Sequence, residues 1–112
     1  MALVRFGEFE GDLQTGELFK QGRKIPLEAK PFRLLATLLE RPGQLVTRGE
    51  LRRRIWPPGT YVDFGRCVNI AATKVRHALA DSSHHPRYIE TLPKRGYRLI
   101  APVEARGHRL HY

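Results

Sequence analysis

The sequence predicts an α+β domain in which short antiparallel strands stand at both ends of the chain and three helices lie between them. Three observations support this prediction. Short β-prone runs broken by glycine fill residues 3–27, and two more β-prone runs occupy residues 88–100. Between them, apolar residues recur at helical spacing in two segments, and a capping box opens a third helical segment between the two. A chain of 112 residues is long enough for one domain with a modest core.

Residues 3–27 are expected to form a small antiparallel meander of four strands, at 3–6, 9–12, 17–20 and 23–27. Gly7-Glu8 and Gln21-Gly22 separate the strands within each pair, and glycine between short β-prone runs is typical of tight hairpin turns. Residues 1–30 contain five Lys/Arg and five Asp/Glu, so their charge is balanced. We therefore assign this region no chemistry and expect it to support the helices or to contact a neighbouring domain.

The first helix is expected at residues 29–41. Pro31 falls in its first turn, where proline is tolerated, and Arg41-Pro42-Gly43 ends it. Its apolar stripe consists of Phe32, Leu35, Ala36 and Leu39. Because nearly all of its bulk is aliphatic, we interpret it as a core helix.

The second helix is expected at about residues 48–56. Thr47-Arg48-Gly49-Glu50 is a capping box with Thr47 as the N-cap, and Pro57-Pro58-Gly59 stops the helix. Its cations are Arg48, Arg52, Arg53 and Arg54. Two helices in quick succession followed by a third basic helix form the order of a helix-turn-helix, here with a long connection at residues 57–66.

The third helix, at about residues 64–80, is the segment that favours a function. Asp63 is its expected N-cap. Its buried face is expected to hold Val68, Ala71, Ala72, Val75, Ala78 and Leu79. Its outer face carries Asn69, Ile70, Thr73, Lys74, Arg76 and His77 and no acid. Such a face suits the base edges and phosphates of a nucleic-acid groove, although a plain solvated face of an amphipathic helix would read the same way.

Residues 88–100 are expected to form a hairpin with a cationic tip at Pro93-Lys94-Arg95. A tip with two cations and a following glycine suits a minor groove or a line of phosphates; an ordinary exposed hairpin is the alternative. From Val103 onward the sequence loses its pattern, and we expect a tail or linker.

The charge of the chain points to a polyanionic partner. Residues 31–112 hold fifteen Lys/Arg and six Asp/Glu and so supply the whole net charge of +9. Cys67 is the single cysteine, which excludes an internal disulfide framework. The chain has no apolar run near the roughly 20 residues that span a bilayer and no signal-peptide pattern, so we expect a cytoplasmic protein without membrane contact.

Other classes of function find less support in the sequence. An enzyme of the nuclease type needs clustered carboxylates, and the acids of this chain lie on separate elements without ligand spacing. We therefore expect no enzymatic activity, no metal, no cofactor and no small-molecule substrate. An RNA-binding module would display aromatic stacking platforms, whereas the aromatics here fall mostly on apolar positions of strands and helices.

Motifs in the second half of the chain match those of a known family. They are Trp56 with the loop to Val62-Asp63, the pair Val68-Asn69 with Val75-Arg76-His77-Ala78-Leu79, and the closing string Tyr88-Ile89-Glu90-Thr91-Leu92-Pro93-Lys94-Arg95-Gly96-Tyr97-Arg98. Over about residues 3–103 the chain resembles the OmpR/PhoB-type winged-helix DNA-binding domain. The residues at 56–57, 62–64 and 69 are closer to the transcriptional-activator branch that resembles CadC than to the response-regulator consensus.

This resemblance implies a winged helix-turn-helix: an N-terminal four-stranded antiparallel sheet, three helices and a C-terminal β-hairpin wing, over residues 1–103, with 104–112 as a tail or linker. It implies sequence-specific duplex DNA binding by a bacterial-type transcriptional regulator. The third helix would enter the major groove, and the wing at 93–96 would enter the minor groove. A domain that keeps the fold but contacts proteins, or that binds nucleic acid without reading sequence, is the alternative.

The resemblance also assigns roles to individual residues. The base-reading residues would be Asn69, Ile70, Thr73 and Lys74. The DNA backbone would be contacted by Trp56, Arg66, Cys67, Arg76, His77 and Tyr97. Lys94 and Arg95 would reach the minor groove. The 57–66 loop matches the segment with which the family contacts RNA polymerase, and family members often bind direct repeats, which makes RNA polymerase and a tandem dimer on DNA candidate partners.

Two departures from the family pattern stand out. Glu28 and Pro31 replace the usual hydroxyl cap and acid at the start of the first helix, which costs little if Glu28 caps that helix. Cys67 stands near a position where a small hydroxyl residue often binds a phosphate, and a thiol is a weaker donor.

Overall fold

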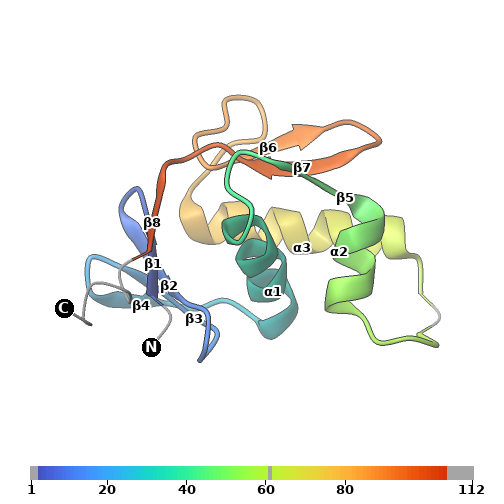
Figure 1. Cartoon of the computed structure of the whole chain (residues 1–112), viewed down its shortest axis with the longest axis horizontal. Helices are drawn as coiled ribbons and strands as arrows, with labels where there is room; N and C mark the ends of the chain where they lie inside the picture. Colours follow the sequence, from blue (N-terminus) through green and yellow to red (C-terminus); the bar gives the residue numbers. More distant parts are fainter. Residues whose placement is uncertain (1–2, 61, 106–112) are drawn as a thin grey trace.

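The computed structural model describes residues 3–60 and 62–105, and these ranges contain three helices and eight strands (Figure 1). In chain order they are β1 (Leu3–Phe6), β2 (Phe9–Asp12), β3 (Glu17–Lys20), β4 (Arg23–Ile25), α1 (Ala29–Leu39), β5 (Leu45–Thr47), α2 (Arg48–Ile55), α3 (Phe64–Leu79), β6 (Ile89–Leu92), β7 (Gly96–Leu99) and β8 (Val103–Ala105). Every predicted helix and strand is present, and each boundary agrees within two residues. The predicted class, an α+β winged helix-turn-helix, is confirmed.

The N-terminal sheet has five strands in the order β4-β3-β2-β1-β8. The meander β1 to β4 is antiparallel throughout, as predicted. The fifth strand corrects the prediction, because Val103 was expected to open a patternless tail, and the predicted boundary after residue 103 now falls inside β8. Val103 pairs with Phe6, at the far end of the chain. A three-residue strand is too short to show an alternating sequence pattern, so it can be recognised only from its pairing with β1. Residues 106–112 lie outside the described range.

The second sheet has the order β5-β7-β6 and forms the wing side of the domain. The hairpin of β6 and β7 was predicted. Strand β5 was not predicted. Val46 pairs with Tyr97 and Thr47 with Gly96, so the segment before α2 is tied to a strand fifty residues later.

The core lies between the two sheets and is filled mainly by the helices. Leu34, Leu35 and Leu38 of α1 are completely buried, which confirms that α1 is a core helix. Figure 1 shows the N-terminal sheet at one end of the molecule, the helices beside it, and the β5–β7 sheet along one side of the helices. In the described residues, no helix is both long and apolar enough to cross a bilayer.

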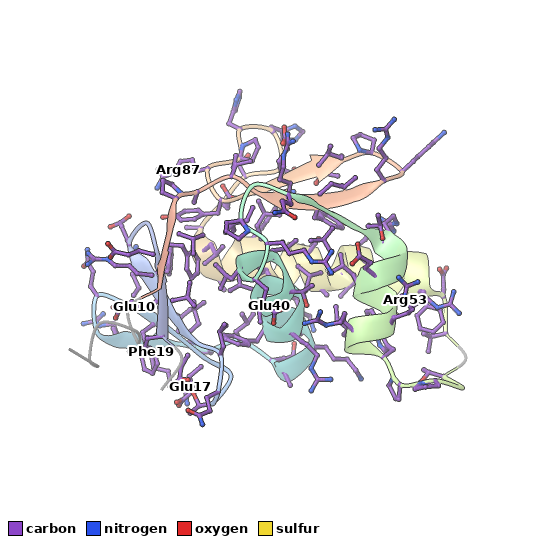
Figure 2. The ribbon with its side chains drawn as sticks, in the orientation of Figure 1. Glu10, Glu17, Phe19, Glu40, Arg53 and Arg87 are labelled. Carbon is purple, nitrogen blue, oxygen red and sulfur yellow. The ribbon has the colours of Figure 1, made fainter. Side chains whose placement is uncertain are left out.

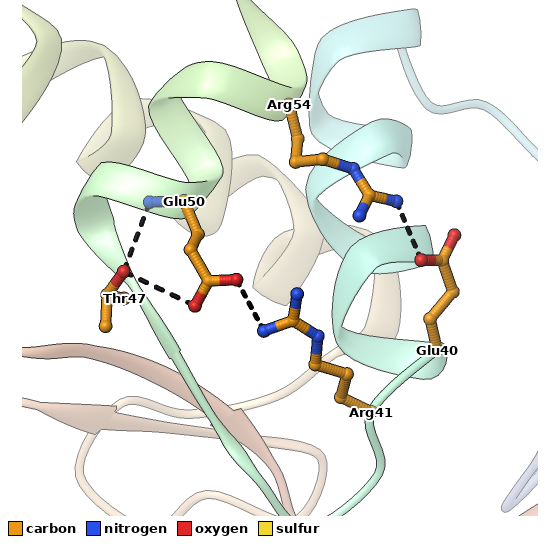
Figure 3. Close-up of polar contacts among 5 residues, drawn as sticks. All are labelled: Glu40, Arg41, Thr47, Glu50 and Arg54. Carbon is orange, nitrogen blue, oxygen red and sulfur yellow. Dashed lines mark hydrogen bonds and ion pairs between the residues drawn. The ribbon is translucent and has the colours of Figure 1, made fainter.

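The junction between α1 and α2 carries the predicted capping box (Figure 3). The Thr47 hydroxyl accepts the backbone N–H of Glu50 at 3.1 Å, as an N-cap does. Arg41 forms an ion pair with the Glu50 carboxylate at 2.5 Å and is the main cause that lowers the pKa of Glu50. Arg54 of α2 pairs with Glu40 at the end of α1, at 2.7 Å. The two ion pairs hold both the first and the last turn of α2 against the end of α1.

At Gly96 the backbone of β5 leaves no room for a side chain on β7. A Cβ built there would overlap the carbonyl oxygen of Val46 and lie 3.0 Å from the Cα of Thr47. Both are backbone atoms of a paired strand, so neither can move aside without breaking the sheet. Only glycine therefore fits here.

Gly96→Ala is expected to lower the free energy of unfolding by about 1–3 kcal/mol, because overpacking forces the two strands apart. Gly49→Ala in α2 is the matched control. Its Cβ would meet only the end of the Arg53 side chain, at 3.5 Å, and alanine favours a helix by up to about 1 kcal/mol. Denaturant unfolding of both variants checks this; equal stabilities would show that the β5–β7 contact yields easily.

Candidate nucleic-acid interface

Helix α3 is defined at both ends by capping contacts. The Asp63 carboxylate accepts the backbone N–H of Arg66 at 3.2 Å, which confirms the predicted N-cap. At the other end Ala80 adopts the left-handed conformation, with φ 54°, and the Asp81 N–H donates to the Arg76 carbonyl at 2.8 Å. This 6→1 bond is that of a Schellman motif. The helix therefore ends at once, and the chain turns toward the wing.

The outer face of α3 consists of a central stripe of exposed side chains, with Asn69 on one side of it and Lys74 on the other. Its buried side consists of Val68, Ala71, Ala72, Val75 and Leu79. Opposite them, at spacings of four, three and four residues, lie Arg66, Ile70, Thr73 and His77, all exposed. Ile70 is 45% exposed. The stripe combines two basic side chains, a hydroxyl and an aliphatic group and contains no acid.

Asn69 lies on the flank of α3 that faces the wing. Its Oδ1 accepts two hydrogen bonds, from Arg48 Nη1 at 3.1 Å and from the Tyr97 hydroxyl at 2.9 Å. Because a guanidinium can only donate, the side-chain oxygen of Asn69 must face Arg48. Both lone pairs of that oxygen are then used inside the domain. The two N–H groups of the amide are what Asn69 retains for a ligand.

Arg48 ties α2, α3 and the wing together. Its Nη2 donates to the carbonyl of Gly65 at 2.8 Å, in the first turn of α3, and its backbone N–H donates to the carbonyl of Arg95 at 3.1 Å. Arg48 was predicted only as one of the cations of the second helix. Its position at the start of the second helix was the one sequence signal of a structural role. Its partners could not be predicted, because they come from segments that are distant in the sequence.

Lys74 lies on the opposite flank of α3, toward α1. Its ammonium group forms an ion pair with the carboxylate of Glu28 at 2.6 Å. Glu28 occupies the N-cap position of α1 but makes no side-chain capping bond. The condition under which this departure from the family pattern would cost little is therefore not met, because the Glu28 carboxylate turns to Lys74 and does not cap the helix.

Three residues predicted to contact the DNA backbone are held within the domain. Arg76 donates to the Ile89 carbonyl at 3.1 Å and to the Thr91 hydroxyl at 2.5 Å, so its guanidinium anchors α3 to β6. Tyr97 is only 3% exposed, and its hydroxyl is bound to Asn69. Trp56 is 9% exposed and packs edge-on against Phe64, with ring centroids 5.8 Å apart. The sequence signals for these residues were compatible with either role, since burial depends on the neighbouring elements.

The remaining predicted residues lie on or beside the outer face. Arg66 and His77 are exposed, and Cys67 is partly buried beside the loop before α3. The segment from Pro57 to Asp63 is described except for Tyr61. On α2, Arg52, Arg53 and Arg54 are exposed, and Figure 2 shows Arg53 pointing outward from the helix.

The tip of the wing is a tight turn of Leu92 to Arg95, closed by the Arg95 N–H and the Leu92 carbonyl at 2.9 Å. Proline stands at its second position and Lys94, with φ 64°, at its third. Proline followed by a positive φ is the signature of a type II turn, whose third position favours glycine. Lys94 and Arg95 are both exposed. The turn thus carries a lysine where the backbone prefers glycine.

Asp81 joins the end of α3 to the start of the wing. Its carboxylate accepts the backbone N–H groups of Arg87, Tyr88 and Ile89 at 2.8, 3.2 and 3.0 Å. Partial burial pushes the pKa of Asp81 upward, but these backbone hydrogen bonds, with one from Ser82, outweigh it and lower the pKa below its usual value. Asp81 was not among the predicted functional residues, because its partners lie six to eight residues further along the chain.

A three-helix core, a third helix with a basic outer face and a hairpin fixed beside it define a winged helix-turn-helix domain. Residues 22–99 match the family model described as "Transcriptional regulatory protein, C terminal". The chain belongs to this family, whose domains are of the OmpR/PhoB type.

Known proteins of this family are similar to the chain in sequence and in structure. The cholera toxin homolog transcriptional activator of Vibrio parahaemolyticus is 35% identical over 80 residues, which cover 71% of this chain and 27% of that protein. The DNA-binding domain of E. coli CadC superimposes with a TM-score of 0.78 at 28% identity and covers 95% of this chain and 98% of its own. The Klebsiella pneumoniae RstA DNA-binding domain, solved in complex with the RstA box, superimposes with a TM-score of 0.73 at 26% identity. The match covers 88% of this chain and 96% of the RstA domain. The chain thus spans about a quarter of the length of the Vibrio activator it matches.

Asp81→Asn is expected to destabilise the domain by about 1–2 kcal/mol at pH 7, because a carboxylate that accepts several backbone N–H groups is replaced by a group that can accept fewer. The folded-state pKa of Asp81 is lowered, so its stabilisation is complete above the ordinary carboxyl pKa and is lost as the pH falls through the lowered value. The difference in free energy of unfolding between the two proteins should therefore shrink below about pH 4.

Asp63→Asn is the control for this measurement. Asparagine and aspartate cap helices about equally well, and the Asp63 side chain accepts the backbone N–H of Arg66 at 3.2 Å. Unfolding curves between pH 3 and pH 7 compare the variants. A difference at Asp81 that stays constant with pH would contradict the assigned role of the charge.

Proposed function

We propose that this domain binds duplex DNA in a sequence-specific manner, as part of a bacterial-type transcriptional regulator, with α3 in the major groove and the wing at the minor groove. The observation that carries the proposal is the exposed stripe of α3, which has basic, hydroxyl and aliphatic groups and no acid. The width of the major groove admits a helix, and its edges offer acceptors, donors and thymine methyl groups. The membership of the family and its DNA-binding members support this proposal.

Within α3 we assign base reading to the four predicted residues, each by its chemistry. Exposed Ile70 suits a thymine methyl group, and the hydroxyl oxygen of Thr73 suits a donor on a base edge. Thr73 donates to the carbonyl of Asn69 at 2.9 Å, which leaves its oxygen as an acceptor. Asn69 offers only donors, so it would contact acceptors such as guanine O6 or N7 and would not make the two-bond contact with adenine that needs its oxygen.

Residues around this stripe are proposed to contact the DNA backbone and the minor groove. Arg66 and His77 lie at its two ends and suit phosphates on either side of the groove. Lys94 and Arg95 at the tip of the wing suit the negative potential of a narrow minor groove. Trp56, Cys67, Arg76 and Tyr97 remain proposed backbone contacts at the margin of this surface. The main proposed role of Arg76 and Tyr97 is to hold α3 and the wing in a fixed position relative to each other.

Further partners are part of the proposal in outline. The loop at residues 57–66 carries exposed Val62, and Arg52 to Arg54 lie at the end of the preceding helix, a surface open to RNA polymerase when α3 is on DNA. Tandem copies on direct repeats are the proposed assembly. A domain that reads the bacterial chromosome acts in the cytoplasm.

Selection of bound duplexes from a random library tests the central proposal. We expect an enriched motif, and we expect the best duplex to bind at least about 10³-fold more tightly than scrambled DNA at physiological salt. A salt series on both duplexes gives the number of phosphate contacts from the slope. Steep salt dependence without an enriched motif would replace the proposal by non-specific binding, and no binding at all would favour a domain that works through protein contacts.

Lys94→Gly separates the DNA contact at the wing from the stability of the wing. Glycine relieves the positive φ at this position, so the free energy of unfolding should change by less than about 1 kcal/mol. Loss of the cation should weaken binding to the selected duplex and make the salt slope shallower by about 0.9. Unchanged affinity and slope would remove the wing tip from the DNA surface.

A further inference from the structure

Glu28 is an acid at the edge of the proposed DNA surface. It stands at the N-cap position of α1, 46 residues before Lys74, and its carboxylate lies 2.6 Å from the Lys74 ammonium group. It borders one hollow shared with Val62, Ile70 and Lys74 and a second shared with Thr73 and His77. The carboxylate thus stands beside the side chains that are proposed to read bases.

Stability does not explain this ion pair. The side chains of Lys74 and Glu28 are 48% and 70% exposed, and exposed pairs contribute about 0–1 kcal/mol. Glu28 also makes no capping bond, although a serine, threonine or aspartate at the same position would stabilise α1. The position therefore lacks an ordinary helix cap and has a carboxylate directed at a lysine of the recognition helix.

The chemistry of an ammonium group suggests what the pair does. Lysine has three N–H donors on a flexible stem, and without a partner it binds any phosphate within reach. A hydrogen bond to Glu28 uses one donor and balances the charge, while two donors remain for acceptors on a base edge. Phosphates gain little from a lysine that is already neutralised, and they are repelled by the carboxylate.

We propose that Glu28 is a specificity-determining residue that holds Lys74 toward base acceptors and away from phosphates, and so lowers the affinity of the domain for DNA without its target sequence. This inference rests on the proposed function. In the complex with the target, Lys74 keeps its ion pair with Glu28 and donates to acceptors such as guanine O6 and N7. On other DNA the pair offers no base contact and little attraction to phosphate.

Glu28→Gln tests the proposal, with Glu40→Gln as the matched control. Both remove one negative charge, and both break an exposed ion pair of α1, at 2.6 and 2.7 Å. Glu28 precedes the first residue of α1 and Glu40 follows the last, so the control lies at the opposite end of the helix and pairs with α2 (Figure 3). Unfolding curves show whether each variant is folded.

Affinities of the three proteins are measured for the selected duplex and for scrambled DNA over a salt series. Glu28→Gln should tighten binding to scrambled DNA about threefold or more and steepen its salt slope by about 0.9, because Lys74 is released to a phosphate. The ratio of the two affinities should fall. Glu40→Gln should leave that ratio at the wild-type value.

Three results would overturn the inference. If both variants change the ratio equally, Glu28 acts only through net charge. If Glu28→Gln weakens binding to the selected duplex and alters its preferred bases, Glu28 reads a base itself, as a carboxylate can at cytosine N4. If the wild-type protein selects no motif, the proposed function fails and the inference fails with it, a result distinct from the other two.

Discussion

The carboxylate of Asp81 is the constraint on which the arrangement of the candidate interface depends. One side chain accepts three successive backbone N–H groups at the start of the wing, while its own backbone N–H closes the end of α3. The helix and the hairpin are therefore joined through a single residue. A rigid link of this kind matters because two elements can contact neighbouring grooves together only if their separation does not vary.

Further contacts reinforce this link along the length of α3. Arg76 binds β6, and Asn69 binds both Arg48 and Tyr97. These side chains carry the functional groups that suit DNA, yet they are used between elements of the domain. The polar network at the margin of the interface thus preorganises the surface, and the side chains in the middle of the stripe remain free to contact a ligand.

Residues 1–30 and residues 31–112 contribute differently to folding and to the proposed binding. The N-terminal sheet has balanced charge and closes one side of the core through Phe6 and Phe9, which meet the ring of Tyr88 at 6.0 and 5.3 Å. The net positive charge of the chain comes entirely from residues 31–112. Hydrophobic contact joins the halves, and electrostatic attraction to a polyanion belongs to the second half alone.

The sequence by itself determined the three helices and six of the eight described strands, because their signals are local. Helical spacing of apolar residues, the capping box at Thr47, the cap at Asp63 and glycine between β-prone runs each depend on neighbours within a few residues. The order of the elements and the basic outer face of α3 followed from the same local patterns. These were sufficient to predict an α+β domain with a helix-turn-helix order and the surface that is proposed to bind DNA, whereas the winged arrangement was implied by the resemblance to the OmpR/PhoB-type domain.

Only the tertiary structure decided which polar side chains are available. Strands β5 and β8 are three residues long, and each exists because a distant strand supplies its hydrogen bonds. The same applies to Glu28 with Lys74 and to Asp81 with the wing, pairs that no periodicity links. A side chain that suits DNA by its chemistry is free for DNA only if no nearer group binds it, and which groups are near depends on how the whole chain packs.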